Sequence, residues 1–274
     1  MKKYWRRHLL NYLETFTDKI SYERRMHIQW AFNALVTAIA IPYCIYYGYW
    51  EMLGWGYLWA YLVVCIGANA GFHRWASHHA WNPSEPVKWF MMFMFMFGSP
   101  GSPLVTVLFH RFHHKHSDDT LDPHSPHQIS FLEIATGRFQ KSSGYLSSGK
   151  DMFKEPSVLF FHRHYWKVQA AIYLGALILG GPLFFAIFVC FCGFYNSTVI
   201  GHIVDGALAH YKWLGYRWFD TKDNSQNNPI LAFLSGGEAW HNNHHAKPGR
   251  WYFGHKWWEF DPAGFLIWAV LKRI

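Results

Sequence analysis

Three stretches without any Lys, Arg, Asp or Glu constrain what this 274-residue chain can fold into. Two of them, residues 28–50 and 52–72, are long enough for a helix of ~20 residues to cross the bilayer. The third, residues 168–204, has Gly180-Gly181-Pro182 in its middle, which favours a hairpin of two crossings. The sequence therefore predicts an all-α integral membrane protein with four spans, at about residues 28–50, 52–72, 165–182 and 183–204.

The composition agrees with a membrane location. Only 15% of the residues are charged, against about 25% in soluble domains, and 20% are aromatic. A further apolar segment, residues 89–109, is broken by glycines, serines and prolines between residues 98 and 103. Its unbroken part is too short to cross, so we expect an interfacial or re-entrant segment there.

Basic residues predict the orientation. Seven of them precede the first span, whereas the turns around Glu51 and Gly181 contain none. By the positive-inside rule, both termini face the cytoplasm. Residues 73–164 and 205–274 would then form a cytoplasmic cap, and the whole chain, 1–274, a single domain. The seven residues are Lys2, Lys3, Arg6, Arg7, Lys19, Arg24 and Arg25.

Histidines are concentrated in three short motifs of the expected cap. "HRFHH" contains His110, His113 and His114, and "HNNHH" repeats this spacing with His241, His244 and His245. "HRWASHH" contains His73 and His78, with His79 beside them. On a helix, residues three and four apart share one face, so we expect the rings of each motif to converge.

Such clusters favour metal binding, because each neutral imidazole offers one lone pair. Eight imidazoles exceed the four ligands of a structural zinc and suit two redox-active ions with open positions. A metal transporter is the alternative from another class, but its ligands would lie within the spans rather than after them. The four cysteines lie in apolar stretches and are expected to be buried thiols: Cys44, Cys65, Cys190 and Cys192.

The motifs and their order resemble those of the membrane-bound fatty acyl desaturases, in particular the stearoyl-CoA and bacterial Δ9 desaturases. The resemblance extends from about residue 66 to residue 263. It is carried by "GFHRWASHH", "HRFHHKHSDDTLDPH", "GYRWFDTKDNSQNN", "GEAWHNNHH" and "HKWWEFDP".

This resemblance implies a dioxygen-dependent desaturase that introduces a cis double bond into a saturated acyl chain, with Δ9 as the expected position. Two iron ions, held in a helical cap above four spans, would be the cofactors. Electrons would come from a cytochrome b5 or a ferredoxin with its reductase, and the substrate would be an acyl-CoA or an acyl-lipid. Hydroxylation of the acyl chain is the alternative within the same architecture. A bacterial inner membrane is favoured over the endoplasmic reticulum, and nucleic acid is not an expected partner.

The resemblance also implies which residues hold the metal. The ninth ligand of the family precedes a Gly-Tyr-Arg, present here as Gly215-Tyr216-Arg217, and His210 is preferred for it over His202. The implied ligands are His73, His78, His110, His113, His114, His210, His241, His244 and His245. Residues expected to support or orient them are His79, His116, Asp205, Asp122 and Asn228.

Overall fold

A computed structural model describes residues 21–140 and 144–274. Within these residues the regular structure is helical, and the only β-type pairings are two isolated bridges, Tyr216–Asn227 and Asn227–Trp240. Most of the basic residues behind the predicted orientation lie outside the described part: Lys2, Lys3, Arg6, Arg7 and Lys19.

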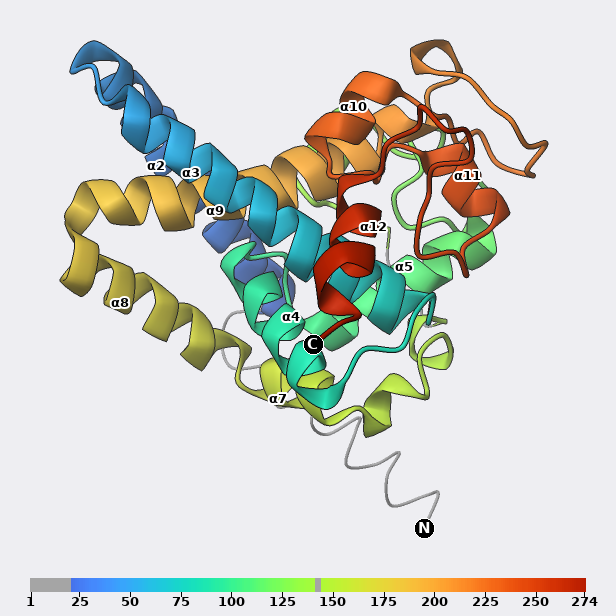
Figure 1. The fold of residues 1–274 in the computed structure, drawn as a ribbon, viewed down its shortest axis with the longest axis horizontal. Coiled ribbons are helices and arrows are strands. Elements are labelled where there is room, and N and C mark those ends of the chain that lie inside the picture. Colours follow the sequence, from blue (N-terminus) through green and yellow to red (C-terminus); the bar gives the residue numbers. More distant parts are fainter. Residues whose placement is uncertain (1–20, 141–143) are drawn as a thin grey trace.

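Three helices are long and apolar enough to cross a membrane: Tyr22–Tyr46, Trp50–Ser77 and Tyr165–His210. The first is α2 (Tyr22–Tyr46), which begins after Ser21, whose hydroxyl accepts a hydrogen bond from the Arg24 amide. The second consists of α3 (Trp50–Val63) and its π-helical continuation η1 (Val64–Ser77). The ends of α2 and α3 project together from one corner of the molecule (Figure 1). Both helices begin before the stretches predicted at residues 28–50 and 52–72.

The third candidate folds back on itself at Gly181, whose φ of 76° and ψ of 179° are not helical. Glycine adopts such a positive φ without steric cost, and Pro182 cannot donate the next helical hydrogen bond. The fold-back separates two arms that diverge as a V in Figure 1. The two arms comprise α8 (Tyr165–Phe185), η4 (Ala186–Cys190), α9 (Phe191–Gly193), η5 (Phe194–Asp205) and η6 (Leu208–His210). The predicted break at residues 180–182 is therefore present.

The apolar segment at residues 89–109 is also broken as expected. It forms α4 (Glu85–Phe97) and α5 (Pro103–His116), separated by a turn at residues 98–102. Side chains of other helices hydrogen-bond to this turn and to the end of α4, since Trp30 donates to the Ser99 carbonyl at 2.9 Å and Gln169 to the Met96 carbonyl at 2.7 Å. Such pairing is what non-helical backbone requires when it is packed among apolar helices. The turn fixes the start of α5, which carries the second histidine motif.

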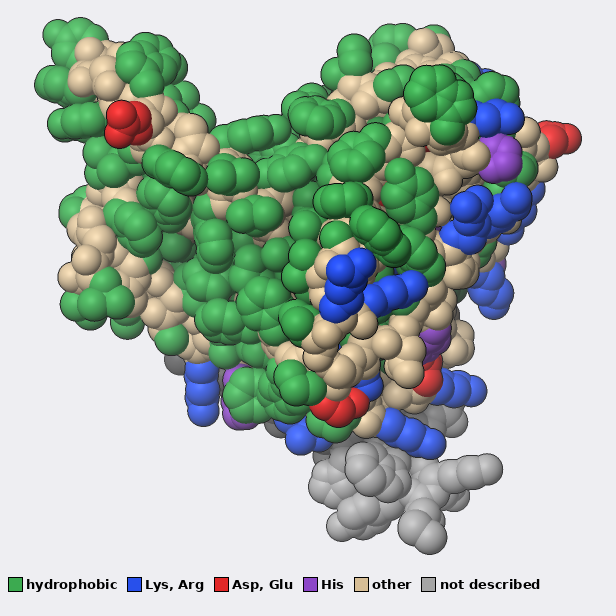
Figure 2. All heavy atoms as spheres, viewed as in Figure 1, with side chains coloured by type: hydrophobic (Ala, Val, Ile, Leu, Met, Phe, Trp, Pro, Cys, Tyr) green, Lys and Arg blue, Asp and Glu red, His purple; other side chains and the backbone are tan. Residues whose placement is uncertain are grey.

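Short helices and loops make up the rest. Figure 2 shows hydrophobic side chains covering the arms on the left, whereas Lys and Arg gather along the lower and right-hand parts of the molecule. All four cysteines are buried and free, as predicted. The remaining elements are α6 (Phe131–Ala135), η2 (Tyr145–Ser147), η3 (Met152–Lys154), α7 (Pro156–Arg163), η7 (Lys212–Leu214), α10 (Pro229–Leu234), α11 (His241–Ala246), α12 (Pro262–Leu266) and η8 (Ile267–Leu271).

Candidate metal centre

Nine histidines gather in two adjacent groups. Within each group, the nitrogen atoms that could bind a metal lie within 4.8 Å of one another. The five-histidine group consists of His73, His78, His110, His114 and His244. The four-histidine group consists of His113, His210, His241 and His245. These are the nine positions named from the sequence; His202 belongs to neither group.

A π-helix explains the unusual spacing of the first motif. His73 and His78 are five residues apart, which would put them on different faces of an α-helix. They lie at the end of η1, where the His78 amide donates to the His73 carbonyl at 3.2 Å, an i→i+5 bond. The wider π-helical turn brings residues five apart onto one face. Both rings therefore reach the five-histidine group.

The other two motifs do not converge as expected. In an α-helix each residue is rotated by about 100° from the last, so i and i+4 share a face while i+3 lies on the other side of it. On α5, His110 and His114 join the five-histidine group, and His113 points to the four-histidine group. On α11, His241 and His245 join the four-histidine group, and His244 joins the other. Each motif thus serves both groups.

The ring nitrogens are as close as ligands of one cation. Nε2 of His244 lies 2.9 Å from Nε2 of His73 and 2.9 Å from Nε2 of His114. Nε2 of His210 lies 3.0 Å from Nε2 of His241 in the other group. Two nitrogens bound at about 2.1 Å and at right angles to each other would be about 3 Å apart. The spacing therefore fits a shared metal ion in each group.

Helix α11 has no apolar residue long enough to anchor it, and two asparagines hold it in place. Asn242 accepts hydrogen bonds from the amides of Trp218 and Phe219, both at 2.9 Å. Asn243 donates to Asn227 Oδ1 through its amide at 3.1 Å and to the Phe253 carbonyl through its side chain at 3.0 Å. In "HNNHH" the two asparagines thus fix a helix of six residues, and its three histidines extend to the two histidine groups.

Buried carboxylates lie behind three rings of the four-histidine group. Asp122 accepts from Nδ1 of His113 at 3.0 Å. Asp118 accepts from Nδ1 of His210 at 3.0 Å, and Asp223 from Nδ1 of His245 at 2.6 Å. A carboxylate on Nδ1 fixes the tautomer and leaves the Nε2 lone pair for the metal. In the five-histidine group, Glu238 contacts Nδ1 of His73 in the same way.

The protonation of these groups suits metal binding. Burial, followed by the charge of neighbouring histidines, lowers the pKa values of His78, His110 and His244 well below the ordinary range. Burial lowers the pKa of His245 to about 4, although its hydrogen bond with Asp223 acts in the opposite direction. Burial would raise the pKa of Asp223, but its hydrogen bond with His245 holds that pKa below the usual range. These four imidazoles are therefore neutral and Asp223 is ionised near neutral pH, whereas the pKa of His210 is raised because its hydrogen bond with Asp118 outweighs the effect of burial.

The other residues named from the sequence lie elsewhere, except Asp122. His79 is exposed and contacts Asp151 at 2.8 Å, and His116 pairs with Asp119 at 3.0 Å. Asn228 caps α10 by accepting from the Leu231 amide at 3.0 Å, so it supports the fold rather than a ring. Asp205 lies on a cavity wall, and its buried Oδ1 has no hydrogen-bond partner within the described part of the chain.

Two carboxylates of the site were not among the residues named from the sequence. They are Glu238 and Asp223. Both lie in quoted motifs, "GEAWHNNHH" and "GYRWFDTKDNSQNN", and acidic residues within polar motifs near histidines were the available signal. Asp118 lies in a third quoted motif, "HRFHHKHSDDTLDPH", whose aspartates are expected to orient histidine rings or to cap turns, and its carboxylate hydrogen-bonds to His210.

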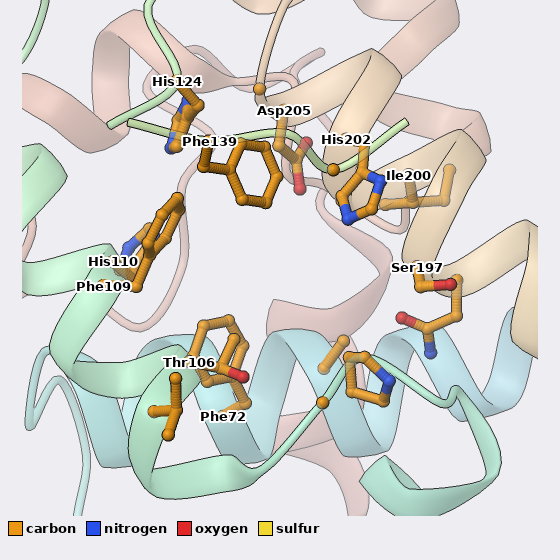
Figure 3. A pocket seen from close by; sticks show the side chains of 18 of the residues that line it. Phe72, Thr106, Phe109, His110, His124, Phe139, Ser197, Ile200, His202 and Asp205 are labelled. Atoms are coloured by element: carbon orange, nitrogen blue, oxygen red, sulfur yellow. The ribbon is translucent and has the colours of Figure 1, made fainter. Parts of the chain in front are cut away.

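A cavity of about 340 Å³ reaches the two groups. His73, His110, His113 and His241 form part of its wall. Figure 3 shows Phe72, Thr106 and Phe109 on one side of the space and Phe139, Ile200 and His202 on the other. Most of the surface that lines the cavity is apolar, as in pockets that bind apolar ligands. A long apolar molecule in this cavity would have one part of its chain beside the histidines.

Unpaired nitrogens provide a test of whether metal fits. Nε2 of His113 and Nε2 of His245 are buried and find no hydrogen-bond partner among residues 21–140 and 144–274, although their Nδ1 atoms are held by carboxylates. Buried polar atoms are normally paired, so a cation or a water molecule is the expected partner of these lone pairs. The donor set is nitrogen only, which suits iron, copper, zinc or nickel better than calcium or magnesium.

The helical fold, the membrane-crossing lengths and the histidine groups define a membrane protein with a histidine-rich metal-binding centre. Comparison with known sequences identifies its family: the fatty acid desaturase model matches residues 53–272. The chain belongs to the fatty acid desaturase family, and it is an oxidoreductase of the membrane-bound fatty acyl desaturase class. The resemblance stated from the motifs is confirmed.

Individual relatives act on different acyl carriers. An sn-1 stearoyl-lipid 9-desaturase of Anabaena variabilis is 30% identical over 230 residues, which are 82% of this chain and 81% of that protein. An acyl-CoA C20 Delta5-desaturase of Anemone leveillei is 28% identical over 273 residues, 92% of this chain and 82% of that protein. A hex-5-enoyl-[acyl-carrier protein] acetylenase of Moorena producens is 28% identical over 233 residues, 78% of this chain and 72% of that protein.

Proposed function

We propose that this protein is a diiron desaturase that converts a saturated fatty acyl chain into a cis-monounsaturated product, with the double bond at Δ9. The observation that carries the proposal is the position of nine histidines, in two groups, at the wall of an apolar cavity. Family membership supports acyl-chain desaturation, and the stearoyl-lipid 9-desaturase supports the Δ9 position.

The nine histidines would hold the two ions, five on one and four on the other. Bound iron would supply the activation of dioxygen that removal of unactivated hydrogens requires. The protein's own residues would do the rest. Asp118, Asp122, Asp223 and Glu238 would orient four rings, and the cavity would hold the acyl chain beside them while its aromatic walls exclude water.

The reaction needs a reductant as well as dioxygen. Two hydrogens leave the acyl chain, two electrons and two protons are added, and both oxygen atoms leave as water. The electron donor would be a cytochrome b5 or a ferredoxin with its reductase. The carrier of the acyl chain is open between CoA, a carrier protein and a glycerolipid, since the relatives differ in this respect.

The apolar helices support a multi-pass protein. Two helices and the two arms on either side of Gly181 would make four spans, beneath a cap formed by residues 73–164 and 205–274. Arg24 and Arg25 flank the start of α2, which supports cytoplasmic termini and a cytoplasmic metal site. A bacterial inner membrane is the proposed location.

The test is expression in a host that lacks its own desaturase, with the fatty acids of each lipid class analysed by mass spectrometry. We expect a cis-Δ9 monounsaturated acid to accumulate, and none to form with His241→Ala. A hydroxylated or acetylenic product would replace this proposal with another oxidation on the same architecture. Lipids unchanged from the host, although the protein is inserted and loaded with iron, would contradict it.

A further inference from the structure

Arg74 is the largest side chain in the described part of the structure that is completely buried, and no part of the proposed reaction accounts for it. It follows His73 directly in η1, but its side chain does not enter either histidine group. A buried guanidinium is costly unless it is paired, so its surroundings indicate its role.

Two carboxylates from the C-terminal part of the chain meet Arg74. Nη2 of Arg74 lies 3.2 Å from Oε1 of Glu238 and 3.1 Å from Oδ1 of Asp261. Both carboxylates are almost fully buried. The other oxygen of Glu238 contacts Nδ1 of His73, so the guanidinium is one carboxylate away from a ring of the five-histidine group.

A second connection from Arg74 passes through an aromatic ring. The guanidinium carbon lies 4.0 Å from the centre of the Phe253 ring, within cation–π range. The same ring packs against His244, with centroids 4.3 Å apart and planes at 32°. His73 and His244 are neighbours in the five-histidine group, with Nε2 atoms 2.9 Å apart. The Arg74 guanidinium therefore contacts two side chains, Glu238 and Phe253, that each lie against one ring of the five-histidine group.

The backbone is shaped around this arrangement. Gly237 has a φ of +108°, and a Cβ there would lie 2.1 Å from Oδ1 of Asp261 and 3.2 Å from Nη2 of Arg74. Asp261 also accepts from the Phe253 amide at 2.7 Å and from the Gly264 amide at 2.9 Å, where it caps α12. The pair Arg74–Asp261 thereby ties the C-terminal segment to the end of η1.

We propose that Arg74 is a positioning residue for the five-histidine group, which it acts on through Glu238 and Phe253. Its charge keeps the Glu238 carboxylate turned toward Nδ1 of His73, and its stacking keeps Phe253 against His244. Without it, Glu238 and Asp261 would be two buried carboxylates without a counter-charge, and Glu238 would lose one of the two side chains that hold it in place. This inference rests on the proposed metal centre and adds a residue outside the ligand set to it.

The experiment measures iron retained by purified, detergent-solubilised protein during timed exposure to a chelator. In Arg74→Gln, the affinity of the five-histidine group for its ion should fall about 10–100-fold, as for other residues that orient ligands. The chelator should therefore remove one of the two ions faster than it does from the wild type. The ion released should be the same one that His78→Ala, which removes a proposed ligand of that group, fails to bind, and the second ion should be retained as in the wild type. Asp223→Asn, which acts on His245, is the matched control and should release the ion of the other group.

Glu238→Gln keeps the side-chain shape and leaves Arg74 paired with Asp261, so it tests the same connection if Arg74→Gln does not fold. It should weaken the same ion, and the double variant Arg74→Gln/Glu238→Gln should be no worse than either single variant. Thermal unfolding of the metal-free proteins separates positioning from a general loss of stability. Arg74→Gln or Glu238→Gln retaining both ions with wild-type resistance would overturn the proposal, as would equal loss of both ions. A wild-type protein without two ions would instead contradict the proposed function.

Discussion

The two histidine groups differ in what lies behind their rings. In the four-histidine group, three rings donate to a separate buried aspartate: His113 to Asp122, His210 to Asp118 and His245 to Asp223. In the five-histidine group, among the described residues, only His73 lies at ion-pair distance from a carboxylate, and Arg74 shares that carboxylate.

The consequence is a difference in local charge. The three aspartates also accept from neutral donors, for example Asp118 from the Asn224 amide and Asp223 from Ser225, and no Lys or Arg of the described part of the chain forms an ion pair with them. Such charge favours a cation and increases the basicity of the ligands. The five-histidine group instead has one more histidine, and Arg74 contacts Glu238 and Phe253, which lie against two of its rings. We therefore expect orientation and charge to hold the ion of the four-histidine group, and the number of ligands to hold the ion of the other group.

The largest effect expected from this comparison is the removal of a ligand from either group. His78→Ala and His241→Ala should each lose one iron ion and all desaturase activity, because each group has only its own rings to hold its metal. Membrane insertion should remain, since it depends on the apolar helices. Iron per chain and product formation are the measurements, with membrane fractionation as the control. An active variant of either kind would remove that residue from the proposed ligand set.

A smaller and more selective effect is expected from the aspartates. Asp122→Asn and Asp223→Asn keep the side-chain shape but remove the charge, so the affinity of the four-histidine group for metal should fall about 10–100-fold. Chelator-dependent loss of iron measures this. Asp119→Asn is the matched control, because Asp119 is half-exposed and pairs with His116 outside both groups. Equal iron loss in Asp119→Asn would indicate a general effect of surface charge rather than ligand orientation.

The same comparison shows which parts of the site the sequence could predict. Eight of the nine rings that gather in the structure stand in the three motifs and were named from their spacing, whereas the ninth, His210, was implied only by the resemblance to the desaturases. Their partition between two groups was not predicted, because residues i+3 and i+4 were both assigned to the helix face of residue i. They lie about 100° apart around the helix axis, so their rings can reach different groups. The π-helical turn between His73 and His78 was also not predicted, since nothing in the local residue types requires it.

The supporting residues depend on tertiary contacts instead. Asp223 lies in a loop without regular structure, and Arg74 of η1 contacts residues 238, 253 and 261, which are distant in the sequence. No local pattern places these residues together. The fold, too, could be predicted only in part. Charge-free stretches predicted the apolar helices, and Gly180-Gly181-Pro182 predicted the break at Gly181. The helix ends and the path of residues 73–164 and 205–274 depend on packing between distant segments.

The smallest effect is expected from histidines outside both groups, and His202 is the critical case. It was the second candidate for the ninth ligand, but its ring packs edge-on against Trp30, with centroids 4.6 Å apart, and against Phe139 at 5.2 Å. His202→Ala should therefore keep two iron ions. Because His202 lines the cavity, its removal enlarges that cavity and should change substrate binding more than turnover. His210→Ala, in contrast, should lose the ion of the four-histidine group. Iron content measured alongside KM and kcat distinguishes the two. Iron loss in His202→Ala with retention in His210→Ala would move the ninth ligand deeper along η5, toward the apolar arms, and would leave Asp118 without a ligand to orient.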